Sequence, residues 1–80
     1  MQQINVNYFA LFRDLANKSS ETISTQAKTT ADLYEELKKK YDFPLSQCKL
    51  KVAVNDEFTN FDYELKNQDK VVFIPPVAGG

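Results

Sequence analysis

The chain has 80 residues, enough for one small domain with a single modest core. Its formal net charge of −1 argues against a strong field for nucleic acid or an anionic membrane, so we expect neither as a partner. It contains no histidine, which excludes Ser-His and Cys-His nucleophile pairs and the usual zinc sites, and we expect no metal.

Cys48 is the single cysteine, so an internal disulfide is excluded and a reducing compartment is expected. Without a base to activate it, Cys48 is interpreted as a small, half-buried apolar residue. The sequence has no apolar run of the length of a membrane span or a secretory signal. We therefore expect a cytoplasmic protein.

The N-terminal third predicts a strand, a short helix and a second strand. Residues 3–9 alternate, which places Ile4, Val6 and Tyr8 on one face and Asn5, Asn7 and Phe9 on the other. Residues 10–18 then show helical spacing of Leu11, Phe12, Leu15 and Ala16 over about two turns. Residues 21–26 alternate again and are rich in β-branched residues, with Ile23 pointing inward.

Residues 29–41 are the strongest helix of the sequence. Thr29 or Thr30 can cap it, and Thr29 with Asp32 has the capping-box spacing. Leu33, Leu37 and Tyr41 form the expected buried stripe, with Tyr34 beside it. The lysines at 38–40 are interpreted as a solvated face that pairs with the glutamates at 35–36 one turn earlier.

The C-terminal half predicts three further strands. Residues 49–55 form the first, Asn55-Asp56 is a turn signal, and residues 57–59 return as a short strand. Leu65 is a core anchor in an irregular segment, and residues 70–74 form a last strand that is apolar on both faces. The order predicts an α+β fold, a mixed sheet of four to five strands with one main helix on one face and a short helix.

The face of the sheet away from the main helix should be polar if it meets only water. That rule is broken by Val72, Ile74 and Phe9, and we expect Phe58 to join them. Such exposed apolar patches often mark partner surfaces. The alternative is that loop residues such as those at 61 and 63 fold over the patch and cover it.

The last residues form an unusual tail. Pro75 and Pro76 end the sheet and stiffen the chain, which can then reach about 19 Å further to Gly80. Side chains shrink from Val77 and Ala78 to Gly79 and Gly80, which are the only glycines of the sequence. This taper favours a segment that threads a narrow slot in another protein over a frayed terminus. We expect a folded domain at residues 1–75 and a flexible tail at residues 76–80.

These residues resemble a known family. The YFA after the first strand, Arg13-Asp14, VAVN and above all VVFIPPVAGG are similar, nearly end to end, to molybdopterin synthase small subunits. These are sulfur carriers with the ubiquitin-like β-grasp fold. Asp56 and Gln68 depart from the family, because both stand where glycine is usual, and a strained or altered turn is expected at each.

The resemblance implies a cycle at the terminal carboxylate of Gly80. An activating enzyme consumes ATP to adenylate Gly80, and a sulfurtransferase or cysteine desulfurase supplies the sulfur of a thiocarboxylate. The tail, residues 75–79, then enters the active site of the large synthase subunit in a heterotetramer, where sulfur passes to a pyranopterin precursor of the molybdenum cofactor. The chain itself binds no cofactor, and the large subunit carries the chemistry. The implied partner contacts are Phe9, Phe58 and Ile74, with Arg13 as a weaker candidate.

Three alternatives remain open on the sequence alone. The chain could be a sulfur carrier for thiamine or for tRNA thiolation, since those carriers share the fold and the Gly-Gly ending. It could be a ubiquitin-like modifier joined to lysines through Gly80. It could also be a plain binding module whose tail is incidental.

Overall fold

The structure, a computed structural model, describes residues 1–76. In these residues, two helices and five strands follow the predicted order, and one 3-10 turn that we did not predict precedes the third strand. Their bounds are β1 (Gln2–Tyr8), α1 (Leu11–Ala16), β2 (Ser20–Thr25), α2 (Thr30–Tyr41), η1 (Gln47–Lys49), β3 (Lys51–Val54), β4 (Glu57–Thr59) and β5 (Lys70–Ile74).

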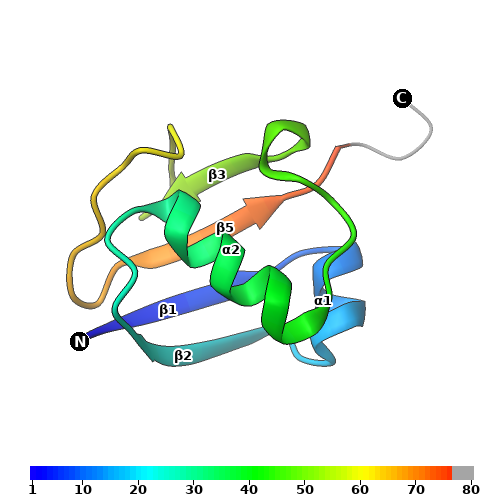
Figure 1. Ribbon diagram of the computed structural model, residues 1–80, viewed down its shortest axis with the longest axis horizontal. Coiled ribbons are helices and arrows are strands. Elements are labelled where there is room, and N and C mark those ends of the chain that lie inside the picture. Colours follow the sequence, from blue (N-terminus) through cyan, green and yellow to red (C-terminus); the bar gives the residue numbers. More distant parts are fainter. Residues whose placement is uncertain (77–80) are drawn as a thin grey trace.

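The five strands form one mixed sheet in the order β2-β1-β5-β3-β4. β1 and β5 run parallel at its centre, and the other neighbouring pairs are antiparallel. α2 lies across one face of this sheet (Figure 1). A mixed sheet that wraps one main helix is the ubiquitin-like β-grasp architecture, so the predicted fold class is confirmed.

α2 begins and ends as its sequence predicts. The Thr29 Oγ1 accepts a hydrogen bond from the Asp32 backbone N–H at 3.2 Å, which caps the helix start. Asp42 ends the helix in the left-handed conformation, two residues before Pro44. Leu33, Tyr34 and Leu37 are fully buried against the sheet, whereas Tyr41 is only half-buried at the rim of the core.

The alternation of the strands also places their side chains as predicted. Ile4, Val6 and Tyr8 of β1 and Val71 and Phe73 of β5 are buried beneath α2. Leu65 is 5% exposed, which confirms it as a core anchor of the irregular segment before β5.

Two local predictions need correction. The strand expected at residues 49–55 is shorter, because η1 occupies residues 47–49 and β3 spans only residues 51–54. The apolar alternation could not show this, since Leu50 is buried in either conformation. In α1, Phe12 and Ala16 are buried, while Leu11 and Leu15 are 37% and 39% exposed, because a helix of six residues presents only one short stripe to the core.

The turn between β3 and β4 follows the predicted Asn55-Asp56 pair. Both residues have a positive φ, 52° and 73°, which is the backbone of a type I′ hairpin turn. In the part of the chain that the structure describes, no helix has the length and apolar character needed to cross a membrane.

Candidate functional site

The candidate site surrounds the point at which the chain leaves the sheet. β5 is central, since it pairs with β1 on one side and β3 on the other, and it ends at Ile74. Pro75 and Pro76 follow and have no N–H with which to continue the ladder. Val77, Ala78, Gly79 and Gly80 lie outside the described residues, so their predicted role as a threading tail stays a prediction.

A hollow lies on either side of this exit, and Ile74, Pro75 and Pro76 line both. The first has a volume of about 480 Å³, and its other lining residues are Phe9, Ala10, Leu11 and Leu45. The second has a volume of about 420 Å³, and its other lining residues are Cys48, Lys49, Leu50, Lys51 and Phe58. The base of the tail therefore stands between two apolar depressions.

The structure brings the predicted contact residues to these hollows. Phe9 is 58% exposed and lines the first, Phe58 is 71% exposed and lines the second, and half-buried Ile74 lines both. They surround the exit of the chain instead of forming one continuous cluster. Arg13 is exposed on α1 and lines neither hollow. Their contact with a partner stays a prediction.

A tight turn presents Phe9. β1 ends at Tyr8, so Phe9 is one residue beyond the strand in which we expected it. Ala10 has φ 50° and ψ −118°, the first central position of a type II′ turn, and the Phe12 N–H donates to the Phe9 carbonyl at 3.1 Å. This turn exposes both Phe9 and Leu11, and Leu11 is a lining residue that sequence reasoning missed.

Leu45 is the second lining residue that the sequence did not predict. The Tyr34 hydroxyl donates a hydrogen bond to the Leu45 carbonyl at 2.6 Å and so ties the segment after α2 to the helix. Burial, together with the negative charge of Glu35, raises the pKa of Tyr34 to about 12. The hydroxyl therefore remains a donor at neutral pH and holds Leu45 beside the exit.

The face of the sheet away from α2 has a polar half and an apolar half. On β1 and β2 the side chains bond to one another, since Thr22 Oγ1 donates to Asn5 Oδ1 at 2.7 Å and Gln3 Nε2 donates to Ser24 Oγ at 3.3 Å. On β5, β3 and β4 the register places Val72, Ala53 and Phe58 in one row. We call this second half of the open face the apolar half; it consists of Val72, Ala53, Phe58, Ile74 and Lys51.

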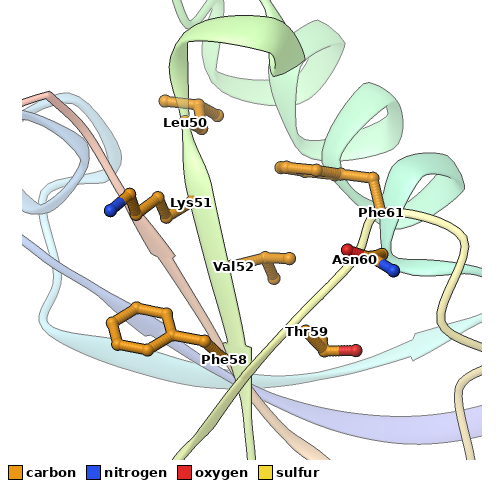
Figure 2. A pocket seen from close by; sticks show the side chains of 7 residues that line it. All are labelled: Leu50, Lys51, Val52, Phe58, Thr59, Asn60 and Phe61. Atoms are coloured by element: carbon orange, nitrogen blue, oxygen red, sulfur yellow. The ribbon is translucent and has the colours of Figure 1, made fainter.

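The alternative in which loop aromatics cover this apolar half is wrong. Phe61 stacks on Phe73 with ring centroids 6.2 Å apart, and Phe73 points to the core beneath α2. Tyr63 likewise packs against the core. Figure 2 shows Phe61 and Phe58 on opposite sides of β3, around a hollow of about 450 Å³. In the described structure, Phe58 is left on the uncovered side.

Cys48 does not have the half-buried position that we expected, since it is exposed beside the exit of the chain. Its Sγ lies 3.2 Å from the Ser46 Oγ. Residues 1–76 contain no group of three or more acidic or cysteine side chains placed to hold a metal ion. In its described part, the site offers apolar contact surfaces around the point at which the chain leaves the sheet, and not a cluster of acids and bases.

Comparison with known proteins identifies the family. The ThiS family matches residues 6–80. The molybdopterin synthase sulfur carrier subunit of Escherichia coli (strain K12) is 32% identical over 80 residues, which cover 96% of this chain and 99% of that protein.

Solved structures agree with this result. A putative molybdopterin converting factor, subunit 1, from Pyrococcus furiosus has a TM-score of 0.78 at 32% identity, over 96% of this chain and 100% of that one. A chain in the complex of subunits 1 and 2 of the molybdopterin-converting factor of Helicobacter pylori 26695 has a TM-score of 0.68 at 24% identity, over 99% and 100% of the two chains, and so shares the fold. The chain belongs to the ThiS family.

Proposed function

We propose that this protein is the sulfur carrier subunit of a molybdopterin synthase. The observation that carries the proposal is the full-length similarity to relatives of that name. The Pro-Pro start and Gly-Gly end of this chain's own tail agree with it. The position of the tail supports it, because the central strand β5 directs the chain out of the sheet between two apolar hollows.

The proposed cycle begins with activation of Gly80. A carboxylate is ionised at neutral pH and is a poor electrophile, so an activating enzyme first joins it to AMP from ATP and releases pyrophosphate. A hydrosulfide equivalent from a sulfurtransferase or cysteine desulfurase then attacks the acyl carbon. AMP and a proton leave, and a thiocarboxylate remains. A cycle that needs ATP and reduced sulfur fits the cytoplasm, where we place the protein.

The second half of the cycle takes place in the large subunit. Residues 75–79 enter its active site, and the thiocarboxylate sulfur attacks a carbon of the pyranopterin precursor and displaces an oxygen substituent from it. Water then hydrolyses the acyl–sulfur bond, which leaves the sulfur on the precursor and regenerates the Gly80 carboxylate. Phe9, Phe58 and Ile74 dock the carrier in this heterotetramer, since apolar anchors near the centre of an interface contribute most to binding. The carrier needs no acid or base and binds no cofactor of its own.

Intact-mass and peptide mass spectrometry test this function. The protein is incubated with ATP, its activating enzyme and a sulfur source, and the C-terminal peptide is compared with all others. We expect the mass of that peptide alone to rise by the difference between sulfur and oxygen. An unmodified C-terminal peptide, under conditions that load a known carrier, would rule out any sulfur-carrier function.

A second measurement separates the alternatives. The thiocarboxylated protein is mixed with the large subunit and the pyranopterin precursor, and the dithiolene product is measured. Loading without transfer to this precursor would favour a carrier for thiamine or tRNA thiolation. Lysine conjugates through Gly80 in cell extract would identify a protein modifier. A protein that is neither loaded nor conjugated would be a plain binding module.

A further inference from the structure

The apolar half of the open face carries charge of one sign only. Directly paired residues of neighbouring strands share a face of the sheet. Glu21 pairs with buried Val6 and Glu57 pairs with buried Val54, so both strand glutamates belong to the α2 side. The open face of the five described strands therefore bears lysines and no carboxylate.

Two lysines lie on this face, and they differ in their surroundings. The Lys70 Nζ forms an ion pair with Asp56 at 2.7 Å, at the end of the sheet away from the chain exit. Lys51 takes part in none of the ion pairs between described residues. Its Nζ lies instead 6.0 Å from the centre of the Phe58 ring. Among the described residues, Lys51 thus has no anionic partner for its ammonium group, which lies on an otherwise apolar surface.

Lys51 also lies close to the exit of the chain. The register of β3 and β5 pairs it directly with Ile74, the last residue before Pro75. It lines the second hollow beside the exit and also the hollow around Phe58 and Phe61, so it stands between the two. Figure 2 shows the Lys51 side chain on the same side of β3 as Phe58.

A protein that covers Phe58 and Ile74 must therefore also cover Lys51. An ammonium group that loses its water without gaining a partner is strongly unfavourable, whereas a carboxylate at contact distance offsets much of this cost. Because the described strands supply no carboxylate on this face, the partner has to supply it. The apolar surroundings match an apolar protein surface and not a nucleic acid.

We propose that Lys51 is a specificity-determining residue of this carrier, which pairs with an aspartate or glutamate set in the apolar docking surface of the large synthase subunit. This inference rests on the proposed function, because it names the chemistry of the partner that the function requires. It adds a charge requirement to the apolar contact, so that large subunits without the carboxylate are bound weakly.

Binding of the large subunit from the same organism, measured by calorimetry, tests the inference. Lys51→Met keeps the length of the side chain but leaves the partner's carboxylate buried and unpaired. We expect it to weaken binding by about 30-fold or more, and Lys51→Glu to weaken it further. Lys51→Arg retains the charge and should bind within a few-fold of the unmodified protein. Lys39→Met, at an exposed position on α2, is the matched control and should leave the binding of the large subunit unchanged.

Exchange of the two charges is the stricter test. The surface aspartates and glutamates of the large subunit are replaced by lysine one at a time. We expect one of these variants to bind the Lys51→Glu carrier at least tenfold more tightly than the unmodified large subunit binds that carrier. Melting temperatures of the Lys51 variants should match that of the unmodified protein, since the side chain is exposed.

The outcomes distinguish the inference from the function on which it rests. The inference is wrong if Lys51→Met binds as tightly as the unmodified protein while Phe58→Glu does not bind. In that case the surface docks the partner, but the Lys51 ammonium group reaches water at the rim of the interface. If the unmodified protein neither binds the large subunit nor accepts sulfur at Gly80, the proposed function fails and the inference fails with it.

Discussion

Six non-glycine residues of the described chain adopt a positive φ. They are Ala10, Asn17, Asp42, Asn55, Asp56 and Gln68. Four of them are asparagine or aspartate, whose short polar side chains tolerate the left-handed region. Ala10 and Gln68 have no such tolerance, so the backbone is strained at both. The two glycines of the chain, Gly79 and Gly80, are not used in any of these turns.

Replacement of Gln68 by glycine should stabilise the domain. Relief of a left-handed residue is worth about 1–2 kcal/mol, and the greater freedom of glycine in the unfolded chain offsets part of it. We expect a net gain of about 0.5–1 kcal/mol, which for a domain of this size raises the melting temperature by roughly 2–8 °C. The native contacts survive, because Gln68 bonds to Gln3 and Asn5 through its backbone atoms.

The control for this prediction is Gln26→Gly. Gln26 is exposed and has a negative φ, so glycine there adds only unfolded-state freedom and should lower the melting temperature. Calorimetry of both variants gives the comparison. A loss of stability in Gln68→Gly similar to that in Gln26→Gly would show that the turn at Gln68 is unstrained.

At this scale the sequence predicted a strained or altered turn at Asp56 and at Gln68, and both have a positive φ, but it missed the strained turn at Ala10. Gln68 stood out because the family resemblance led us to expect glycine at that position. Ala10 gave no such signal, since alanine before a helical pattern is ordinary. Its strain comes from the abrupt change of direction between β1 and α1, and that change follows from packing Phe12 into the core.

Among the elements, one carboxylate links strands and helices. Glu21 on β2 accepts hydrogen bonds from the hydroxyls of Tyr8 on β1 and Tyr41 on α2. Lys18 and Lys40 lie 3.4 and 3.8 Å from its other oxygen. Its side chain is 14% exposed, so these are partly buried contacts.

This network explains why the predicted pairs along α2 are wrong. Lys40 pairs with Glu21 and not with Glu36. Glu36 accepts a hydrogen bond from Thr25 at 2.5 Å, and Glu35 accepts one from Gln47 at 2.7 Å. Spacing along a helix shows which pairs are possible, but partners from other elements compete for the same side chains.

The Glu21 network makes a pH-dependent contribution to stability. Burial alone raises the pKa of Glu21, but hydrogen bonds from Tyr41 and Tyr8 and the charges of Lys40 and Lys18 outweigh it, so the pKa lies below its usual 4.5. A depressed pKa stabilises the fold at pH above the unfolded-state value. That stabilisation is lost as the pH falls through the folded-state value.

Glu21→Gln should therefore destabilise the protein by about 1–2 kcal/mol at neutral pH, since the charged hydrogen bonds are weakened. Between about pH 5 and pH 3 the unmodified protein should lose more stability than the variant. The difference between their free energies of unfolding should therefore become smaller as the pH falls. Urea unfolding across this range measures it. Glu57→Gln, at an exposed strand position, serves as control. A difference that is constant with pH would contradict the assignment.

For the molecule as a whole, the sequence predicted the layers but not the exact neighbours at the site. The alternation in β1 and β5 and the capped stripe of α2 determine one covered and one open face. That Lys51 lies opposite Ile74 depends on the pairing of β3 with β5, which residues 55–69 separate in sequence. Leu45 likewise lies at the exit because the segment after α2 is tied to Tyr34 and packs against the core. Single-strand patterns carry no information on such cross-strand and loop contacts.

In residues 1–76 the buried core ends before the chain leaves the sheet. Its side chains come from residues 4–73, and Phe73 on β5 is the last of them. The stability of the domain should therefore not depend on Gly79 or Gly80, whereas the proposed function depends on both. This separation leads to a prediction about where the glycines are needed.

Gly79→Val should leave the melting temperature unchanged within about 1 °C, because the last few residues of a domain usually contribute little to its stability. It should nevertheless sharply reduce sulfur loading or transfer, since a β-branched side chain restricts and widens the tail where a slot would be narrowest. One residue added after Gly80 should be at least as damaging. It displaces the carboxylate by roughly 3 Å, and misplacement by about 1 Å can cost 10²-fold in rate.

One residue added before Met1 is the matched control and should affect neither the melting temperature nor sulfur transfer. Melting curves and sulfur-transfer assays on the three variants decide the matter: full activity of the extended tail would mean that no tight slot exists, and a large fall in melting temperature would mean that the tail belongs to the fold.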